Sequence, residues 1–333
     1  MIFRAVILPV LALFLTTCDG VQSTLEPEGP HAAQIATLWW VMLAICSSVL
    51  MLVCALVLAA VLRGRKKGDA EIVLSRSQKT RLVLTGGVAA PLVVVLGLLI
   101  YSVAISRSMT ADPTNALKIE VVGQQWWWSV AYPGREHSNL NVTTANELHI
   151  PAGRPVAIEL KSRDVIHSFW VANLNGKTDV IPGRTTRTWI QADAPGTWRG
   201  RCAEYCGLQH AHMGFTVTAH SPEDFEQWLV RQREPAPEPT DALAMRGRDV
   251  FLGGPCVMCH TVRGTLALSR IGPDLTHIAS RKTLASGTMP NTRGHLAGWI
   301  LDPQAIKPGT RMPPTNLGSE DLHALLSYLE TLK

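Results

Sequence analysis

Residues 202–213 read Cys-Ala-Glu-Tyr-Cys-Gly-Leu-Gln-His-Ala-His-Met, a stretch that combines thiols, imidazoles and a thioether. Cys202 and Cys206 offer two thiolates, and His210 and Met213 follow within the same loop. These soft and borderline donors are the ligands of copper electron-transfer sites. A second imidazole can come from His167, which lies upstream in a strand-like segment that a folded sheet would bring to the loop. Together with one exposed backbone carbonyl, these side chains would hold two copper ions bridged by the sulfur atoms.

Two other interpretations of this loop stay open. Cys202 and Cys206 could form a disulfide, or they could be half of a zinc site that His210 and His212 complete. Zinc sites in proteins use thiolate, imidazole and carboxylate ligands, so the zinc interpretation gives no role to Met213. It also gives no role to His167, which lies upstream of the loop. The residues therefore favour copper over the two alternatives.

A second motif, Cys256-Val-Met-Cys-His260, has the spacing of a c-type haem attachment site. Cys256 and Cys259 would each form a thioether bond to the porphyrin, and His260 would be the proximal iron ligand. An isolated Cys-x-x-Cys pair can also be a redox dithiol. Here the motif follows a short helical segment in a separate C-terminal module, and this context favours the haem.

The N-terminal third of the chain is predicted to cross a membrane twice. Two charge-free apolar runs, about 35–62 and 82–105, are each long enough for a hydrocarbon core of about 30 Å. The segment between them, 63–81, is rich in Arg and Lys, which places it in the cytoplasm by the positive-inside rule. Residues 32–110 are therefore expected to be a transmembrane hairpin in a bacterial inner membrane, with the rest of the chain on the periplasmic side.

Residues 1–18 have the pattern of an export signal, in which Arg4 precedes an apolar run. Leu-Thr-Thr-Cys at 15–18 has the form of a lipobox, so Cys18 would become the lipidated first residue of the mature chain. The formal net charge of +5 is mild and is concentrated in the cytoplasmic loop. It gives no support for nucleic acid binding.

The remainder is predicted to form two domains joined by a linker. In residues 111–230, apolar side chains such as Val156, Ile158 and Leu160 alternate with others, and Pro-Gly turns separate such runs. Many short strands with this spacing indicate a β-sandwich or barrel. The proline-rich segment 231–240 is typical of a semi-extended linker. Residues 241–333 are predicted to be an all-α module that contains the haem motif.

Several motifs in order resemble subunit II of cytochrome c oxidase. They are the copper-type loop at 202–213 and three further stretches, Gly-Gln-Gln-Trp-Trp-Trp at 123–128, Asp-Val-Ile-His-Ser-Phe-Trp at 164–170 and Gly-Lys-Thr-Asp-Val-Ile-Pro-Gly-Arg at 176–184. The C-terminal module resembles class I cytochromes c. A subunit II with a cytochrome c fused behind it is similar to the caa-type haem–copper oxidases. The resemblance implies a Greek-key cupredoxin fold with a dinuclear copper A centre, followed by an all-α class I cytochrome c domain.

The resemblance also implies roles for individual residues. The carbonyl of Glu204 would be a weak copper ligand, and its side chain would reach a magnesium ion shared with subunit I. Trp126 matches the tryptophan through which family members receive electrons. The distal haem ligand would be Met312, which lies in Lys-Pro-Gly-Thr-Arg-Met-Pro-Pro at 307–314. Met289, in Gly-Thr-Met-Pro, is its competitor.

The expected function is that of the electron-transfer subunit of an aerobic, proton-pumping cytochrome c oxidase. Electrons would pass from the haem c through copper A to the haem–copper centres of subunit I, where oxygen is reduced to water. Expected partners are subunit I, subunit III and a donor that is cytochrome c or a cytochrome bc complex. Two alternatives are a membrane-anchored copper or thiol assembly factor and the copper A subunit of a nitrogen-oxide reductase.

Overall fold

The structure is a computed structural model that describes residues 22–66, 75–110, 113–133 and 142–333. The expected export signal with Cys18, and the centre of the basic loop, lie outside the described residues. The chain divides into two compact units, one formed by residues 33–111 and the other by the remainder. The first unit is an apolar helical hairpin, and the second contains a β-sheet domain and a helical module.

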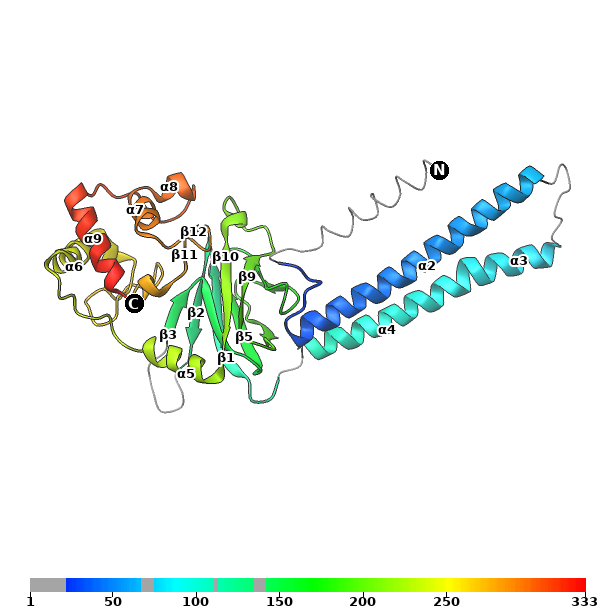
Figure 1. Ribbon diagram of the computed structural model, residues 1–333, viewed down its shortest axis with the longest axis horizontal. Helices are drawn as coiled ribbons and strands as arrows, with labels where there is room; N and C mark the ends of the chain where they lie inside the picture. Colours follow the sequence, from blue (N-terminus) through cyan, green and yellow to red (C-terminus); the bar gives the residue numbers. More distant parts are fainter. Residues whose placement is uncertain (1–21, 67–74, 111–112, 134–141) are drawn as a thin grey trace, which may run out of the picture. The chain divides into compact units, whose positions relative to one another are not determined.

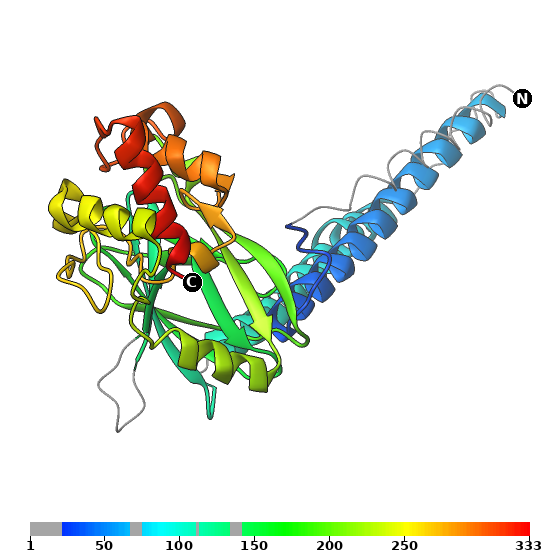
Figure 2. The same ribbon diagram turned by 60° about the vertical axis from the view of Figure 1, so that its left-hand side comes forward.

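The hairpin consists of two helical stretches that are long and apolar enough to cross a membrane. Its elements are α2 (Pro30–Lys66), α3 (Arg76–Leu84), the π-helical turn η1 (Thr85–Ala89) and α4 (Ala90–Thr110). Both views show α2 running beside α4 (Figures 1 and 2). Near the end of the hairpin Ser108 Oγ donates to Gln34 Oε1 at 3.0 Å. The apolar side chains face outward, as expected for helices whose solvent is lipid.

Both helical stretches are longer than the apolar runs at 35–62 and 82–105. The predicted limits mark only the charge-free part, whereas backbone hydrogen bonding continues into the polar flanks. Ser75 caps α3 because its side-chain oxygen accepts from the Gln78 amide, and its own amide donates to Gln78 Oε1. The π-helical turn precedes Pro91, whose missing N–H interrupts the regular ladder.

The β-sheet domain contains two five-stranded sheets. Their orders are β3-β2-β1-β5-β8 and β4-β10-β9-β6-β7. Most pairs are antiparallel, but β1 pairs with β5 and β4 with β10 in parallel. The strands are β1 (Leu117–Gln124), β2 (Trp127–Tyr132), β3 (Val142–Ala145), β4 (Glu147–Pro151), β5 (Val156–Ser162), β6 (His167–Trp170), β7 (Thr178–Val180), β8 (Thr186–Ile190), β9 (Gly196–Cys202) and β10 (Gly214–His220).

Alternating burial along these strands forms the core between the sheets. In β5 the side chains of Val156, Ile158 and Leu160 are buried, as the alternating pattern predicts. Trp128 of β2 is almost fully buried and packs edge-on against Phe169 and Phe215. Helix α5 (Pro222–Arg231) follows β10 and buries its apolar face on the same core. The domain is therefore the cupredoxin-like β-sandwich that the resemblance implies.

The helical module is organised around a close crossing of its first and last helices. Its elements are α6 (Ala242–Gly253), η3 (Pro255–Met258), η4 (Ile278–Ser280), the short hairpin β11 (Thr283–Leu284) and β12 (Met289–Pro290), α7 (Arg293–Leu301), α8 (Pro303–Ile306) and α9 (Ser319–Thr331). A Cβ atom at Gly247 of α6 would lie 1.9 Å from the Ala324 carbonyl oxygen of α9, so only glycine permits this approach. Next to the crossing Phe251 packs against Tyr328, with ring centroids 5.9 Å apart.

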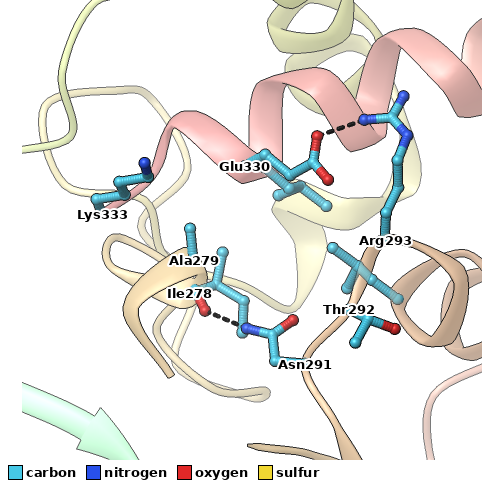
Figure 3. A pocket seen from close by; sticks show the side chains of 9 residues that line it. Ile278, Ala279, Asn291, Thr292, Arg293, Glu330 and Lys333 are labelled. Carbon is cyan, nitrogen blue, oxygen red and sulfur yellow. Dashed lines mark hydrogen bonds and ion pairs between the residues drawn. The ribbon is translucent and has the colours of Figure 1, made fainter. Parts of the chain in front are cut away.

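An ion pair joins α7 to α9. Arg293 pairs with Glu330 beside a surface hollow of about 300 Å³ (Figure 3). In the same view Asn291 donates to the Ile278 carbonyl at 2.8 Å, which connects η4 to the segment before α7. These bonds hold the helices around an apolar core that includes Leu296.

Candidate metal centres

The side chains expected to bind copper meet at one end of the sandwich. Cys202 Sγ lies 3.8 Å from Cys206 Sγ and 3.9 Å from His167 Nδ1. Cys206 Sγ in turn lies 3.7 Å from His210 Nδ1 and 3.7 Å from Met213 Sδ. Both sulfurs and His167 are buried, and Met213 is fully buried. The structure therefore brings together five soft or borderline donor atoms with Cys206 at their centre.

The surrounding strands determine the positions of these side chains. His167 begins β6, and Cys202 ends β9, its antiparallel neighbour. The Cys202 amide donates to the Met213 carbonyl at 2.9 Å, which closes the loop, and the Ala203 amide donates to Ser168. On the opposite side, a Cβ atom at Gly123 would lie 3.0 Å from the His167 ring. Glycine at this position of β1 therefore leaves room for the imidazole.

The arrangement distinguishes among the three interpretations of the loop. The sulfur atoms of Cys202 and Cys206 are 3.8 Å apart and both cysteines are free, whereas a disulfide requires about 2.05 Å. His212 is exposed and bonds to Gln209 Oε1 at 2.7 Å, away from the sulfurs. The buried thioether of Met213 is a donor that copper accepts and structural zinc sites do not use. The donor set fits copper better than zinc.

The carbonyl of Glu204 is the remaining donor at this site. Its oxygen lies 3.2 Å from Cys202 Sγ, close to the sulfur cluster as the resemblance implies. The Glu204 side chain is exposed, and its carboxylate accepts from the Tyr205 amide at 3.1 Å. An exposed carboxylate next to the cluster is free to contact a neighbouring protein surface.

Asp164 holds the His167 ring through Nε2, the ring nitrogen that does not face Cys202 Sγ. Its carboxylate accepts from the Gln125 amide at 2.8 Å and lies 2.9 Å from His167 Nε2. Burial by itself would raise the pKa of Asp164, but hydrogen bonds from Gln125 and His167 outweigh it and lower the pKa. The carboxylate is thus charged and fixes the ring so that Nδ1 points to the sulfurs. Outer-shell carboxylates of this kind orient metal-binding imidazoles.

Replacing Asp164 with asparagine is expected to weaken copper binding by about 10- to 100-fold, because an amide holds the imidazole less firmly and makes it a weaker base. Competition with a copper chelator of known affinity measures the change. Asp179→Asn is the matched control, because Asp179 is an exposed residue of the neighbouring strand β7. An unchanged copper affinity in Asp164→Asn would show that the ring needs no such support.

Trp126 lies between the copper-type loop and the helical module. It is 8% exposed, and its indole Nε1 donates to the Cys206 carbonyl at 3.0 Å. A Cβ atom at Gly309, in the loop that carries Met312, would lie 3.5 Å from the Trp126 ring. The indole therefore touches the backbone of a copper-type ligand on one side and the helical module on the other.

The haem-type motif occupies the start of the helical module. Cys256 is half-buried in the 3-10 turn η3, which follows α6, and Cys259 and His260 come directly after this turn. His260 Nδ1 lies 2.8 Å from the Pro273 carbonyl, which fixes the tautomer and leaves Nε2 for a metal. A Cβ atom at Gly272 would lie 2.8 Å from the same ring, so glycine leaves space for it. These residues would suit a haem, which Cys256 and Cys259 would attach covalently and His260 would ligate.

The two candidate methionines have different surroundings. Met289 lies in β12 and packs against the apolar core of the module. Met312 is half-buried in the loop that contacts Trp126, and its carbonyl accepts from the Gln304 side chain at 3.0 Å. Arg311, which precedes it, lies 3.5 Å from the Asp164 carboxylate. Met289 thus has a packing role, whereas Met312 lies where the module meets the copper-type site.

Several residues of the site were not identified from the sequence. Gln125 and Gln209 each hold a loop, since Gln125 Nε2 donates to the Cys206 carbonyl and Gln209 Nε2 donates to the Pro308 carbonyl. Lys307 donates to the carbonyl of Trp126 at 2.7 Å. Gln125 and Gln209 lie within the motifs at 123–128 and 202–213, and Lys307 begins the Met312 loop. Proximity in sequence to these motifs was the one available signal.

Both the β-sheet domain and the helical module match known protein families. The family of the cytochrome c oxidase subunit II periplasmic domain matches residues 135–220, and the cytochrome c family matches residues 244–333. Cytochrome c oxidase subunit 2 of Alkalihalophilus pseudofirmus is 36% identical, over 98% of this chain and 96% of that protein. The corresponding subunit of Bacillus sp. PS3 is 32% identical over 66% of this chain and 63% of that protein. The periplasmic domain of subunit II (CoxB) of Bradyrhizobium japonicum, a crystal structure, is 28% identical, covers 37% of this chain and 96% of its own, and has a TM-score of 0.34.

Proposed function

Because the chain belongs to the cytochrome c oxidase subunit II family, we propose that it is the electron-transfer subunit of a haem–copper oxidase that carries its own electron donor. The chain is a membrane-anchored oxidase subunit with a copper A domain and a cytochrome c domain. These domains imply copper and haem, which supply one-electron redox chemistry when bound. The family also implies a complex with subunit I.

We assign Cys202, Cys206, His167, His210 and Met213, with the Glu204 carbonyl, as the ligands of the dinuclear copper A centre. The distances among their donor atoms support this assignment. The two thiols lie in a buried loop that is closed by backbone hydrogen bonds, so the loop would keep the ligands in place during a change of redox state. The Glu204 side chain is proposed to contact a magnesium ion at the boundary with subunit I.

In the cytochrome c domain we assign Cys256 and Cys259 as the thioether anchors and His260 and Met312 as the axial ligands. A thioether opposite histidine raises the haem potential, which suits delivery to an oxygen-reducing partner. The oxygen chemistry belongs to subunit I, and proton pumping is proposed for the assembled oxidase. The hairpin is proposed to place both redox domains on the periplasmic side.

The contacts of Trp126 are the main support for the proposal that copper A receives electrons from the cytochrome c domain of the same chain. Trp126 is bonded to the Cys206 carbonyl on one side and is covered by the Met312 loop on the other. A continuous chain of contacts therefore joins the two domains. The exposed entry surface that a diffusing donor would need at Trp126 is occupied by the attached domain. The physiological donor, cytochrome c or a cytochrome bc complex, is then expected to reduce the haem domain.

Pre-steady-state reduction of the purified oxidase tests this order. The haem c absorbance should change first, and the near-infrared band of copper A should follow at a rate that is independent of protein concentration, because covalent linkage makes the step intramolecular. Reduction of copper A before the haem, or a rate that rises with protein concentration, would contradict it. A membrane-anchored assembly factor would show neither signal.

A further inference from the structure

Lys307 connects the Met312 loop to the copper domain from an unusual environment. Its side chain is 2% exposed. Nζ donates to the Trp126 carbonyl at 2.7 Å, to Ser286 Oγ at 3.1 Å and to the Ala285 carbonyl at 3.3 Å. An ammonium group has three donors, and each has an acceptor here. One acceptor belongs to the copper domain and two belong to the cytochrome c domain, so the group is shared across the interface.

The acceptors around Lys307 are neutral. Burial lowers the pKa of its ammonium to about 7, and an opposing electrostatic contribution from Cys206 offsets this only in part. An apolar side chain of similar length would avoid this desolvation cost, so the burial of Lys307 is weak evidence that it stabilises the fold. The hydrogen bonds of the lysine are directional, so they specify where the Met312 loop lies relative to the Trp126 backbone.

Neighbouring contacts hold the same loop in the same place. Ser286 Oγ also donates to the Trp126 carbonyl, at 2.8 Å. The Pro308 carbonyl accepts from Gln209, the residue before the proposed copper ligand His210. Gly309 then approaches the Trp126 ring. The short segment 307–309 thus contacts the copper loop and Trp126 at successive residues, with Met312 three residues further on.

We propose that Lys307 is a positioning residue, which holds the Met312 loop against Trp126 and thereby sets the contact across which the cytochrome c domain delivers electrons. The inference rests on the proposed function, because it assigns the donor contact within that pathway. Among the described residues, the hydrogen bonds of the Lys307 side chain go to Trp126, Ala285 and Ser286, and not to the proposed copper ligands or the haem motif. Lys307 acts through the carbonyl of Trp126.

The test compares Lys307→Met with the unaltered chain in the purified oxidase. Transient reduction by a photoactivated ruthenium complex gives the rate from haem c to copper A. We expect a fall of about tenfold, the change in a docking equilibrium that corresponds to loss of the hydrogen bond from Lys307 to the Trp126 carbonyl, which is the bond of this side chain that crosses between the domains. Absorbance spectra and copper and haem contents should be unchanged.

Hydrogen exchange provides a readout that does not depend on activity. The Gly214 amide of the copper domain donates to the Ser286 carbonyl of the cytochrome c domain at 3.0 Å. A peptide containing Gly214 therefore reports whether the interface is closed, and its exchange should rise in Lys307→Met. Lys282→Met is the matched control, because Lys282 is an exposed lysine of the same domain. Ser286→Ala, which removes one bond to the Trp126 carbonyl, should change both readouts in the same direction but less.

A transfer rate and a Gly214 exchange equal to those of the unaltered oxidase would overturn the role of Lys307. If Lys307→Met does not assemble into the oxidase, the transfer rate and the Gly214 exchange are measured in Ser286→Ala instead. Values equal to those of the unaltered oxidase would then overturn the role of Lys307. The proposed function fails in a different way. In that case the unaltered oxidase itself lacks the copper A band, or its haem c does not reduce copper A, before any variant is compared.

Discussion

Replacing Cys206 with serine is expected to abolish the copper A centre while the haem stays attached. Cys206 Sγ lies within 3.8 Å of Cys202 Sγ and 3.7 Å of both His210 Nδ1 and Met213 Sδ, so it is the atom that connects the donors. A serine hydroxyl is a hard donor that stays protonated and cannot bridge two soft metal ions. Removing a direct ligand should weaken copper binding by more than the roughly 100-fold that outer-shell changes cause.

Elemental analysis and near-infrared absorbance measure this effect. Cys206→Ser should lose the near-infrared band and electron transfer to subunit I, and it should keep one haem per chain. Cys54→Ser is the matched control, because Cys54 is a free cysteine outside the cluster, in α2. Retention of the complete copper signal in Cys206→Ser would show that the sulfur pair is not the bridge. The assembly-factor alternative would then regain support.

Replacing Met312 with leucine is expected to stop electron delivery by lowering the haem potential. Leucine fills a similar volume but offers no sulfur to the iron, and the potential that a thioether opposite His260 confers would be lost. A haem with a lower potential than its normal donor accepts electrons poorly. The variant should keep its covalent haem and its copper, because Cys256, Cys259 and the copper ligands are untouched.

Redox titration and the visible spectrum of the ferric haem test the assignment. Met312→Leu should lose the weak long-wavelength band of sulfur ligation and show a much lower midpoint potential. Met289→Leu should keep both, because Met289 packs against the core of its domain and leucine preserves that packing. The reverse pattern in the two variants would make Met289 the ligand.

The sequence predicted those parts of the fold that depend on local patterns. Alternating burial in β5 and the two apolar helices follow from periodicity and length, so both could be predicted. The copper ligands could be proposed because five of the six lie in one loop whose residue types restrict the metal. The limits of the helices were underestimated, because capping by Ser75 depends on backbone geometry and not on apolar character.

Contacts between distant segments could not be predicted in the same way. Lys307 and Trp126 are 181 residues apart, and no pattern in either segment indicates that a lysine will donate to that carbonyl. Asp164 precedes His167 by three residues, yet its role depends on the Gln125 amide, which belongs to the distant turn between β1 and β2. Residues that orient ligands or join domains act through tertiary geometry, whereas ligands themselves are restricted by their chemistry.

Metal and optical analysis of the whole purified chain within its oxidase tests the two proposed centres together. We expect two copper ions and one covalent haem in this subunit, with the multiline electron paramagnetic resonance of a mixed-valence copper pair. A single copper ion, a zinc ion, or a Cys202–Cys206 disulfide that resists reduction and copper loading would contradict this expectation.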